Sequence, residues 1–312
     1  MKKHILLTGA SGFVGKVLLP TLRNKGYTVI PVYRQAGKGG FRIDSLSADT
    51  DWCGALENTD VVIHTAARVH VMSENADNPL YEFRKVNVDG TLKLAREAAS
   101  AGVKRFIYLS SIKVNGESTD GRAPFSADEE CHPSDPYSIS KKEAEDNLLA
   151  LAQETGMEVV IIRPPLIYGP GVRANFQSMM SWLKKGIPLP LGSIDNQRSL
   201  VSVYNLIDLI LACINHPGAA DQIFLVSDDM DMSIPELLNR LSKALGCRAL
   251  LVPFPKSLLV LGLSLLGRGA LAQRLCGSLQ VDITKNKELL GWRPPVTVDE
   301  GLVKTAQTSQ LN

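Results

Sequence analysis

Three glycines near the beginning of the chain, Gly9, Gly12 and Gly15, separate a short apolar run from an amphipathic segment. Residues 3–8 (Lys-His-Ile-Leu-Leu-Thr) have no helical period and predict a buried strand of a parallel sheet, whereas residues 16–22 predict a helix. Glycine permits a tight turn and lets backbone N–H groups approach a pyrophosphate at the positive N-terminal end of a helix. A G-x-x-G-x-x-G pattern between a strand and a helix therefore predicts a dinucleotide site, and a glycine-rich turn without a ligand is the alternative.

Strand-like and helix-like segments alternate through the first half of the chain. Apolar runs and helical patterns follow one another at residues 27–33, 60–67, 80–101, 104–109, 137–154 and 158–163. This alternation predicts an α/β protein built on a Rossmann-type, doubly wound parallel sheet.

Proline and glycine become frequent after residue 165, which indicates a second, smaller domain. We expect residues 1–165 to form a dinucleotide-binding Rossmann domain, to which residues 198–227 return. Residues 166–197 and 228–312 are expected to form a smaller C-terminal α/β domain that holds the substrate. Helices in this second part are predicted at residues 175–185, 234–245 and 257–275.

The second predicted strand, residues 27–33, ends at Tyr33 and is followed by Arg34. In dinucleotide-binding folds an acidic residue at this strand end binds the ribose of NAD, whereas an arginine binds the 2′-phosphate of NADP. No acidic residue is present here, so the sequence favours NADP(H) over NAD(H). A solvated charge at the end of a strand is the other interpretation of Arg34.

Tyr137 and Lys141 are four residues apart at the start of a predicted helix. Pro136 fits the first helical position, and Ser134 or Asp135 can cap the helix. Residues at i and i+4 share a helix face, so the phenol and the ammonium group are expected to project together. A nearby cation lowers the pKa of a phenol, which suits proton transfer to a substrate oxygen. A surface Tyr–Lys pair without a catalytic role is the alternative.

Charge and cysteine content exclude several classes of protein. The 312 residues carry a formal net charge of +2 without a run of Lys or Arg, so we expect no nucleic-acid partner. The five cysteines are scattered and form no C-x-x-C, so we expect neither a metal site nor a disulfide framework. Reduced thiols favour a cytoplasmic location.

No segment has the roughly 20 consecutive apolar residues that a transmembrane helix needs. The charged and apolar N-terminus ends in glycines rather than in a cleavage site, so we expect no targeting signal. The nearest apolar stretch, residues 257–266, is about half as long as a membrane span. A buried helix or a subunit contact is the favoured interpretation, and a weak association with a membrane surface is the alternative.

Several motifs occur in one order along almost the whole chain. They are the glycine loop, His64-Thr65-Ala66-Ala67, Asn87-Val88-Asp89-Gly90-Thr91, Ser110-Ser111, Tyr137-x-x-x-Lys141, Arg163-Pro164-Pro165-Leu166-Ile167-Tyr168-Gly169-Pro170, Arg198-Ser199-Leu200-Val201-Ser202-Val203 and Leu290-Gly291-Trp292-Arg293-Pro294. Together they resemble the extended short-chain dehydrogenase/reductase family, and more narrowly its NAD-dependent epimerase/dehydratase group, which acts on nucleotide sugars. The resemblance implies a nicotinamide cofactor, a UDP-sugar substrate and a homodimer formed through the helices at 80–101 and 137–154.

The resemblance also implies roles for individual residues. Tyr137 would be the acid/base, Ser111 would hydrogen-bond the sugar oxygen, and Lys141 would hold the nicotinamide ribose and tune Tyr137. Cofactor-binding positions would be Gly9, Gly12, Phe13, Val14, Gly15, Arg34, Asp44, Ser45, Ala66, Ala67, Asn87, Ser110, Tyr137 and Lys141. Substrate-binding positions would be Ser111, Asn175 and Arg198, the last as a clamp on the nucleotide phosphates. Outside the triad and the glycines, a packing or surface role is the competing interpretation.

Three positions differ from the broad family pattern. Asn115 stands where many relatives have tyrosine, and Leu166 stands where epimerases of glucose and galactose nucleotides usually have asparagine. Asn205 belongs to a Tyr-Asn pair that replaces an aspartate-bearing pair. The first two are expected to border the sugar pocket, and they argue against a simple 4-epimerase.

Residues 68–71 and 111–116 are more similar to bacterial enzymes that reduce a UDP-linked 4-keto-6-deoxy-N-acetylhexosamine to UDP-N-acetylquinovosamine, a precursor of surface polysaccharide. The first hypothesis is therefore an NAD(P)H-dependent 4-ketoreductase in which Tyr137 donates the proton. The second is a nucleotide-sugar 4-epimerase of the UDP-glucose or UDP-N-acetylglucosamine type. A non-catalytic NAD(P)-binding scaffold is a third hypothesis, against which the intact Ser-Tyr-Lys set argues.

Overall fold

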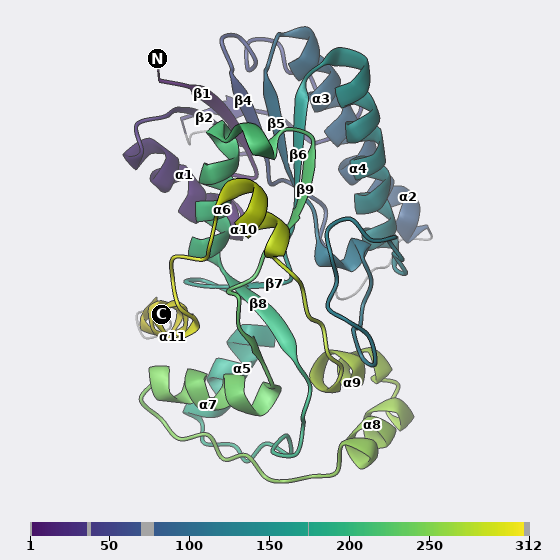
Figure 1. Ribbon diagram of the computed structural model, residues 1–312, viewed down its shortest axis with the longest axis vertical. Helices are drawn as coiled ribbons and strands as arrows, with labels where there is room; N and C mark the ends of the chain where they lie inside the picture. Colours follow the sequence, from purple (N-terminus) through teal and green to yellow (C-terminus); the bar gives the residue numbers. More distant parts are fainter. Residues whose placement is uncertain (1, 36–38, 70–77, 174, 309–312) are drawn as a thin grey trace.

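A computed structural model describes residues 2–35, 39–69, 78–173 and 175–308 of the chain. Within these ranges, seven parallel strands form the main sheet in the order β3-β2-β1-β4-β5-β6-β9 (Figure 1). The strands are β1 (His4–Thr8), β2 (Thr28–Tyr33), β3 (Phe41–Arg42), β4 (Val61–His64), β5 (Arg105–Leu109), β6 (Glu158–Arg163) and β9 (Gln222–Leu225). This is the doubly wound Rossmann-type sheet that the sequence predicted.

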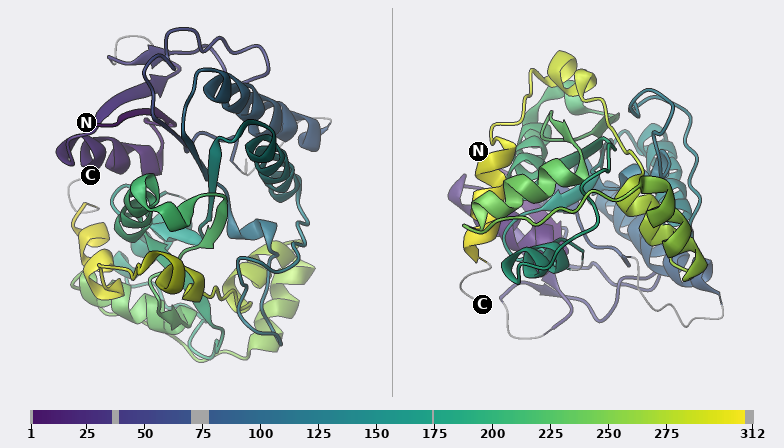
Figure 2. Two further views of the ribbon diagram at one scale, coloured as in Figure 1. Left: turned by 45° about the horizontal axis from the view of Figure 1, so that its top comes forward. Right: turned by 90° about the horizontal axis from the view of Figure 1, so that it is seen from below.

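Helices cover both faces of the main sheet (Figures 1 and 2). On one face, Ile5 and Leu7 of β1 pack in a cluster with residues of α1 (Phe13–Asn24) and α6 (Val203–Asn215). On the other face, Leu6 packs in a cluster with α3 (Thr91–Ser100) and α4 (Pro136–Thr155). Adjacent residues of a strand point to opposite faces, so the continuous apolar run of β1 reflects burial on both sides.

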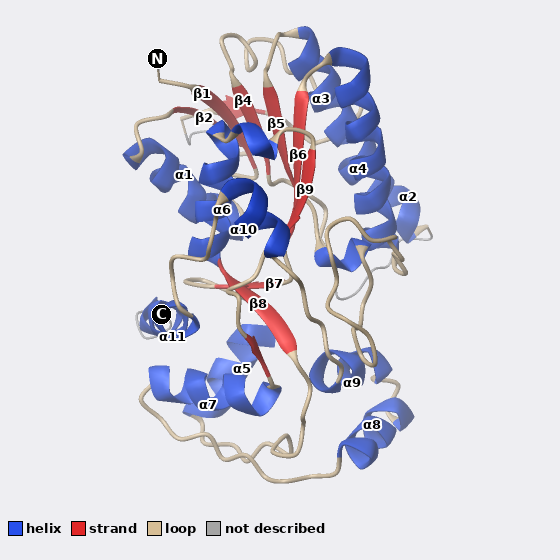
Figure 3. Ribbon diagram, in the orientation of Figure 1, coloured by secondary structure: helices blue, strands red, loops and turns tan. Residues whose placement is uncertain are grey.

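A second sheet of three strands lies beyond the carboxyl ends of the main strands (Figure 3). Its strands are β7 (Leu166–Tyr168), β8 (Arg198–Ser202) and β10 (Asp231–Met232), in the order β10-β8-β7. The helices around it are α5 (Asn175–Lys184), α7 (Ile234–Ala244), α8 (Lys256–Leu265), α9 (Gly269–Cys276) and α11 (Val298–Thr308). Residues of this sheet and of α5, α7 and α11 form a third apolar core.

The segments expected to return to the main sheet are divided between the two sheets. β9 pairs with β6 in the main sheet, and α6 covers that sheet. β8 instead pairs with β7 and β10, so residues 198–202 do not join the main sheet as we expected. After β9 the chain returns once more to the main sheet through α10 (Thr284–Leu290), whose Asn286 donates a hydrogen bond to the carbonyl of Leu225 (2.8 Å). The division into two domains stays a prediction.

Two long helices were predicted in the first half, and they differ in outcome. α4 begins at Pro136, with Asp135 as its N-cap in a capping box with Ser138, and it ends at Gly156 in the left-handed conformation (φ 73°). The helix predicted at residues 80–101 is divided into α2 (Pro79–Arg84), a π-helical turn η1 (Lys85–Gly90) and α3. Short 3₁₀ turns occur at η2 (Ile112–Val114) and η3 (Pro217–Ala219).

Candidate active site

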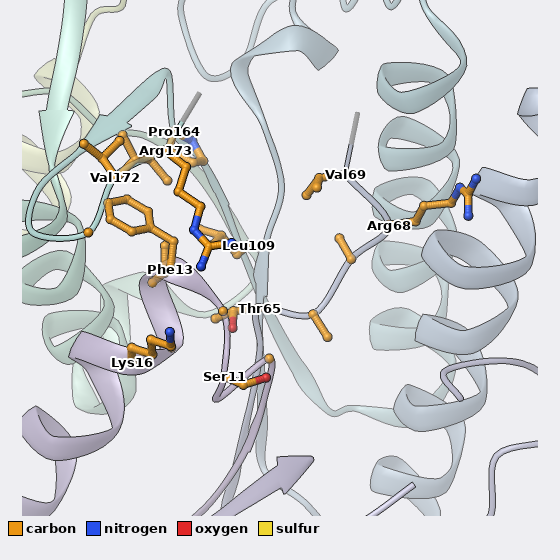
Figure 4. A pocket seen from close by; sticks show the side chains of 18 of the residues that line it. Ser11, Phe13, Lys16, Thr65, Arg68, Val69, Leu109, Pro164, Val172 and Arg173 are labelled. Carbon is orange, nitrogen blue, oxygen red and sulfur yellow. The ribbon is translucent and has the colours of Figure 1, made fainter. Parts of the chain in front are cut away.

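A cavity of about 1740 Å³ opens where the carboxyl ends of the main strands face the second sheet (Figure 4). The order of the strands reverses between β1 and β4, and clefts of doubly wound sheets form at such points. The predicted residues that line the cavity are Gly9, Gly12, Phe13, Val14, Gly15, Arg34, Asp44, Ser45, Ala66, Ala67, Ser110, Ser111, Tyr137 and Lys141. The structure thus brings the glycine loop and the Ser-Tyr-Lys set to one site.

The glycine loop is packed so closely that side chains are excluded at two of its positions. Gly9 has φ 70°, and a Cβ there would lie 2.5 Å from Thr65 Oγ1. A Cβ on Gly15 would lie 2.1 Å from the carbonyl oxygen of Gly9. Gly12 caps α1 without a side-chain hydrogen bond, so the first N–H groups of the helix keep no side-chain acceptor. Such an N-terminus, lining a cavity, suits a pyrophosphate.

Tyr137 stands at the first turn of α4 and forms a hydrogen bond with Ser111. Burial raises the pKa of the Tyr137 phenol to about 12, against the opposing effect of the Ser111 hydrogen bond. We predicted a pKa lowered by Lys141, and the structure shows the opposite direction because desolvation of the phenolate dominates. Tyr137 is therefore a neutral phenol, able to donate a proton, at neutral pH.

Lys141 lies one turn further along the same helix face and is almost completely buried. Its ammonium Nζ donates a hydrogen bond to the carbonyl of Leu109 (2.8 Å) and lies 4.1 Å from the ring centroid of Tyr108. Burial lowers the pKa of Lys141 to about 7, and the charge of Glu145 opposes this effect. A lysine that is half-charged at neutral pH gives Tyr137 only part of the cationic field that we expected.

Glu145 follows on this face of α4 and forms a buried ion pair with Arg163 of β6 (Nη2 to Oε2, 2.5 Å). Arg163 also donates from Nη1 to Asn115 Oδ1 (3.0 Å), and Asn115 is fully buried. We expected Asn115 to border the sugar pocket, but it does not line the cavity and instead anchors Arg163. The pair ties the catalytic helix to the sheet behind Lys141.

Asn87 lies in the π-helical turn and is buried beside the cavity rather than in its lining. Its Oδ1 accepts a hydrogen bond from the backbone N–H of Arg68 (2.8 Å), and its Nδ2 donates to the carbonyl of Arg68 (3.1 Å) and to Ser140 Oγ (3.0 Å). Asn87 thus joins the loop after β4 to α4. His64, predicted to be a packed histidine, bonds Thr8 and Thr91, and burial lowers its pKa to about 3.

Two cations that the sequence did not single out, Lys16 and Arg173, lie with Arg34 at one end of the cavity. A smaller hollow of about 480 Å³ is lined by Lys16, Arg34 and Arg173, together with the hydroxyl-bearing Ser11. Figure 4 shows Lys16 on α1 and Arg173 extending from the loop after β7 into the same cavity. Arg173 was missed because it lies in a proline- and glycine-rich segment without a periodic pattern.

The lining fits a nicotinamide dinucleotide. The glycine loop leaves backbone N–H groups facing the cavity, and the cations around Arg34 suit phosphate. Ser110 Oγ is buried, lines the cavity and has no hydrogen-bond partner in the described part of the chain. A buried hydroxyl of this kind is ready for a polar group of a ligand.

The predicted substrate residues are less closely gathered. Arg198 stands at the start of β8, donates from Nη1 to the carbonyl of Gly277 (2.9 Å) and does not line the cavity. Asn175 begins α5, and its side chain lies outside the described residues, as do residues 70–71 of the reductase-like segment. Leu166, one of the departures from the family pattern, lines the cavity with 43% of its surface exposed. The substrate roles of Arg198 and Asn175 stay predictions.

Comparison with known proteins places these features in context. The profile of the NAD dependent epimerase/dehydratase family matches residues 5–227. The UDP-glucose 4-epimerase of Vibrio cholerae is 50% identical over 98% of this chain and 95% of that protein, and the GDP-6-deoxy-D-mannose reductase of Pseudomonas aeruginosa is 27% identical over 97% and 95%. The crystal structure of the UDP-glucose 4-epimerase of Thermotoga maritima with UDP-glucose has a TM-score of 0.79 and 24% identity, and 99% of each chain is covered.

Proposed function

The chain belongs to the NAD dependent epimerase/dehydratase family, and on this premise we propose that it is a nucleotide-sugar 4-epimerase acting on a UDP-linked hexose or N-acetylhexosamine. One observation carries the proposal: Ser111, Tyr137 and Lys141 line one cavity in a chain that is 50% identical, over nearly its whole length, to a UDP-glucose 4-epimerase. This reverses the order of our two leading hypotheses.

Under this proposal, each member of the set has a task. A nicotinamide held by the glycine loop would supply a reversible hydride acceptor for the oxidation of C4. Ser111 Oγ and Tyr137 Oη, hydrogen-bonded to each other, would both contact the sugar O4. The oxidative half-reaction would require Tyr137 as the phenolate, which would take the O4 proton, and the resulting phenol would return it when the 4-keto sugar is reduced on its other face. Lys141 fixes the start of α4 through its bond to the carbonyl of Leu109.

A 4-ketoreductase is the second candidate, and a specific observation favours it. The buried Tyr137 is protonated at neutral pH, which suits an enzyme whose proton transfer is a donation to the alkoxide of a reduced keto sugar. Leu166, in place of an asparagine, also lines the cavity. The substrate would be the UDP-linked 4-keto-6-deoxy-N-acetylhexosamine of our first hypothesis.

One assay separates the two candidates. The purified protein is incubated with UDP-glucose or UDP-N-acetylglucosamine without added cofactor, and the C4 epimer is sought by chromatography. In parallel, the 4-keto substrate is added with NADH or NADPH, and the absorbance of the reduced nicotinamide is followed. Epimer formation supports the proposal, whereas stoichiometric oxidation of the cofactor without epimer formation establishes the reductase.

Tyr137→Phe is the matched variant for either assay. We expect it to retain cofactor affinity and to lose turnover by about 10²- to 10⁴-fold, because only the proton-transferring hydroxyl is removed. Cofactor affinity is measured by the quenching of protein fluorescence. Turnover that survives in Tyr137→Phe would show that the acid/base assignment is wrong, and a protein inactive in both assays would favour the scaffold hypothesis.

The assembly and location are further proposals. A homodimer is proposed through the helices at 80–101 and α4, which lie side by side on one face of the main sheet (Figure 1). Light scattering after size-exclusion chromatography would detect it, and a monomeric mass at micromolar concentration would contradict it. The cytoplasmic location stays a prediction.

A further inference from the structure

Helix α8 exposes several of its leucine side chains to solvent. None of its residues is buried, and Leu258, Leu261 and Leu265 are 54%, 55% and 79% exposed. These three positions follow the spacing i, i+3 and i+7, so they form one stripe along the helix. Leu266, directly after the helix, is 73% exposed. This differs from our prediction of a buried helix, and α8 lies at the outer end of the second sheet (Figure 1).

The other side of α8 accounts for its attachment to the protein. Leu259 and Val260 pack against the third apolar core, so the helix is held in place by one face. Leu250 and Val252, in the segment before the helix, are 44% and 46% exposed and add apolar surface to this end of the molecule. A contiguous stripe of exposed leucines is typical of a surface that contacts something else.

Basic residues predominate in the segment that carries this stripe, and Lys256 Nζ also lies 3.6 Å from the exposed carboxylate of Asp195. Residues 237–281 contain no aspartate or glutamate. The same segment contains the basic residues Arg240, Lys243, Arg248, Lys256, Arg268 and Arg274. Lys256 begins α8 and Arg268 follows it, so a cation stands near each end of the leucine stripe. Arg268 is exposed.

Leucines flanked by cations, in a segment without acids, complement an anionic bilayer surface. We propose that the leucine stripe of α8 docks on the surface of a membrane that contains anionic lipids. The apolar side chains would enter the acyl boundary, and Lys256 and Arg268 would face the headgroups. No helix in the described ranges is long and apolar enough to cross a membrane, so the contact is one with the surface.

A second copy of the chain fits this surface less well. In a two-fold symmetric dimer the same patch meets itself, which would bring Lys256 and Arg268 of both copies together, with Asp195 of each copy, beside Lys256 (3.6 Å), offsetting part of this charge. Like charges in a contact are unfavourable, whereas anionic headgroups neutralise them. The charge pattern therefore selects the membrane.

The test is sedimentation of the full chain with sucrose-loaded vesicles. Vesicles of phosphatidylcholine alone are compared with vesicles that also contain about 30% phosphatidylglycerol. We expect the partition coefficient to be about tenfold higher with the anionic lipid and to fall in 0.5 M salt, because salt screens the headgroup attraction. Equal binding to both kinds of vesicle, or no binding, would overturn the proposal.

Two double variants separate the contributions. Leu261→Gln/Leu265→Gln is expected to lower binding to anionic vesicles by about tenfold or more, because two apolar side chains can no longer enter the bilayer. Lys256→Gln/Arg268→Gln is expected to lower it by about tenfold. Leu289→Gln, at a leucine of α10 that is 43% exposed, is the matched control and is expected to bind as the wild type does.

Two further readouts keep the result unambiguous. Far-UV circular dichroism and thermal unfolding of Leu261→Gln/Leu265→Gln should match the wild type, because neither side chain is buried. Its mass in lipid-free solution should also be unchanged. If the double substitution instead dissociates a dimer in lipid-free solution, the stripe contacts a second copy and the membrane proposal is wrong.

Discussion

At the scale of single residues, the site is governed by the cost of burying charge. Tyr137 and Lys141 share a helix face, and burial shifts both toward their neutral forms, with pKa values of about 12 and about 7. The sequence could show that the two groups adjoin, but the depth at which they lie depends on the elements packed above them. The direction of both shifts was therefore not readable from the motif.

Lys141 makes this burial measurable through stability. Between pH 7 and about 10.5 the unfolded chain binds a proton at this position that the folded protein lacks, so the free energy of unfolding rises with pH in this window. Below pH 7 the full cost of the buried charge is present. When the pH is lowered from 9 to 7, we expect the free energy of unfolding of Lys141→Met to rise by about 2–3 kcal/mol relative to that of the wild type.

Urea unfolding at pH 7, 8 and 9 checks this expectation. The lost hydrogen bond to the carbonyl of Leu109 shifts the free energy of unfolding of the variant by a constant amount. Only the change of the difference in stability with pH is therefore diagnostic. If the free energies of unfolding of Lys141→Met and the wild type change in parallel with pH, burial does not disfavour the charged form of Lys141.

Arg34 carries the prediction about the cofactor. It lines the hollow with Lys16 and Arg173, where a 2′-phosphate would be attracted. We expect Arg34→Asp to raise the ratio of the Kd for NADPH to the Kd for NADH by about tenfold or more, because a charge-assisted bond is replaced by repulsion. Isothermal titration with both cofactors measures the ratio. Arg23→Asp changes the same charge at an exposed position in the last turn of α1 outside the cavity, and it should leave the ratio unchanged.

At the scale of elements, local patterns located most strands and helices, and long-range packing decided the rest. The strand predicted at residues 158–163 is β6, and the strands predicted at 3–8 and 104–109 differ from β1 and β5 by one residue. The helix predicted at 80–101 is divided by the π-helical turn η1. The sequence did not reveal this turn, because a single wide turn does not disturb the apolar pattern. β8 was assigned to the wrong sheet, because the partner of a strand is not encoded in the strand itself.

The buried pair behind α4 gives a prediction at this scale. Glu145→Gln leaves Arg163 without a counter-charge in the interior, and we expect a loss of about 3–5 kcal/mol in the free energy of unfolding. The adjacent Asp146→Asn removes only an exposed pair with Lys142, and it should cost no more than about 1 kcal/mol. Urea unfolding of both variants at pH 7.5 compares them. Equal losses would mean that the buried pair is not essential for anchoring α4.

At the scale of the whole molecule, the two sheets are joined by a buried polar cluster. Tyr168 of β7 donates to Asp228 Oδ2 (2.6 Å), and Asn205 of α6 donates to Asp228 Oδ1 (2.6 Å). Asn205 also donates to the carbonyl of Val296 and accepts from its N–H (2.7 and 2.9 Å). An amide can make this reciprocal pair of bonds, whereas an ionised carboxylate can only accept, so the cluster suits an asparagine at position 205.

Asn205→Asp tests this cluster. Burial already raises the pKa of Asp228 in the folded protein. Above the ordinary pKa of an aspartate, the folded protein therefore binds more protons than the unfolded chain, and its stability falls as the pH rises. A second carboxylate beside Asp228 strengthens this effect. We expect a loss of about 1–3 kcal/mol at pH 8 that becomes smaller at pH 5, because protonation of one carboxyl relieves the repulsion. Chemical unfolding at both pH values measures it. Asn215→Asp, at the exposed end of α6, serves as the control, and a loss that does not vary with pH would contradict the prediction.

The path of the chain has a consequence for how this protein can change over generations. After the first six strands, the chain passes to the small sheet, returns for α6 and β9, leaves for β10 and α7 to α9, returns for α10 and ends in α11. No single recombination point separates one sheet from the other. We therefore expect a new sugar preference to arise by point substitution or by changes in loop length. Exchange of one N-terminal or C-terminal segment between relatives would not transfer the small sheet as a unit.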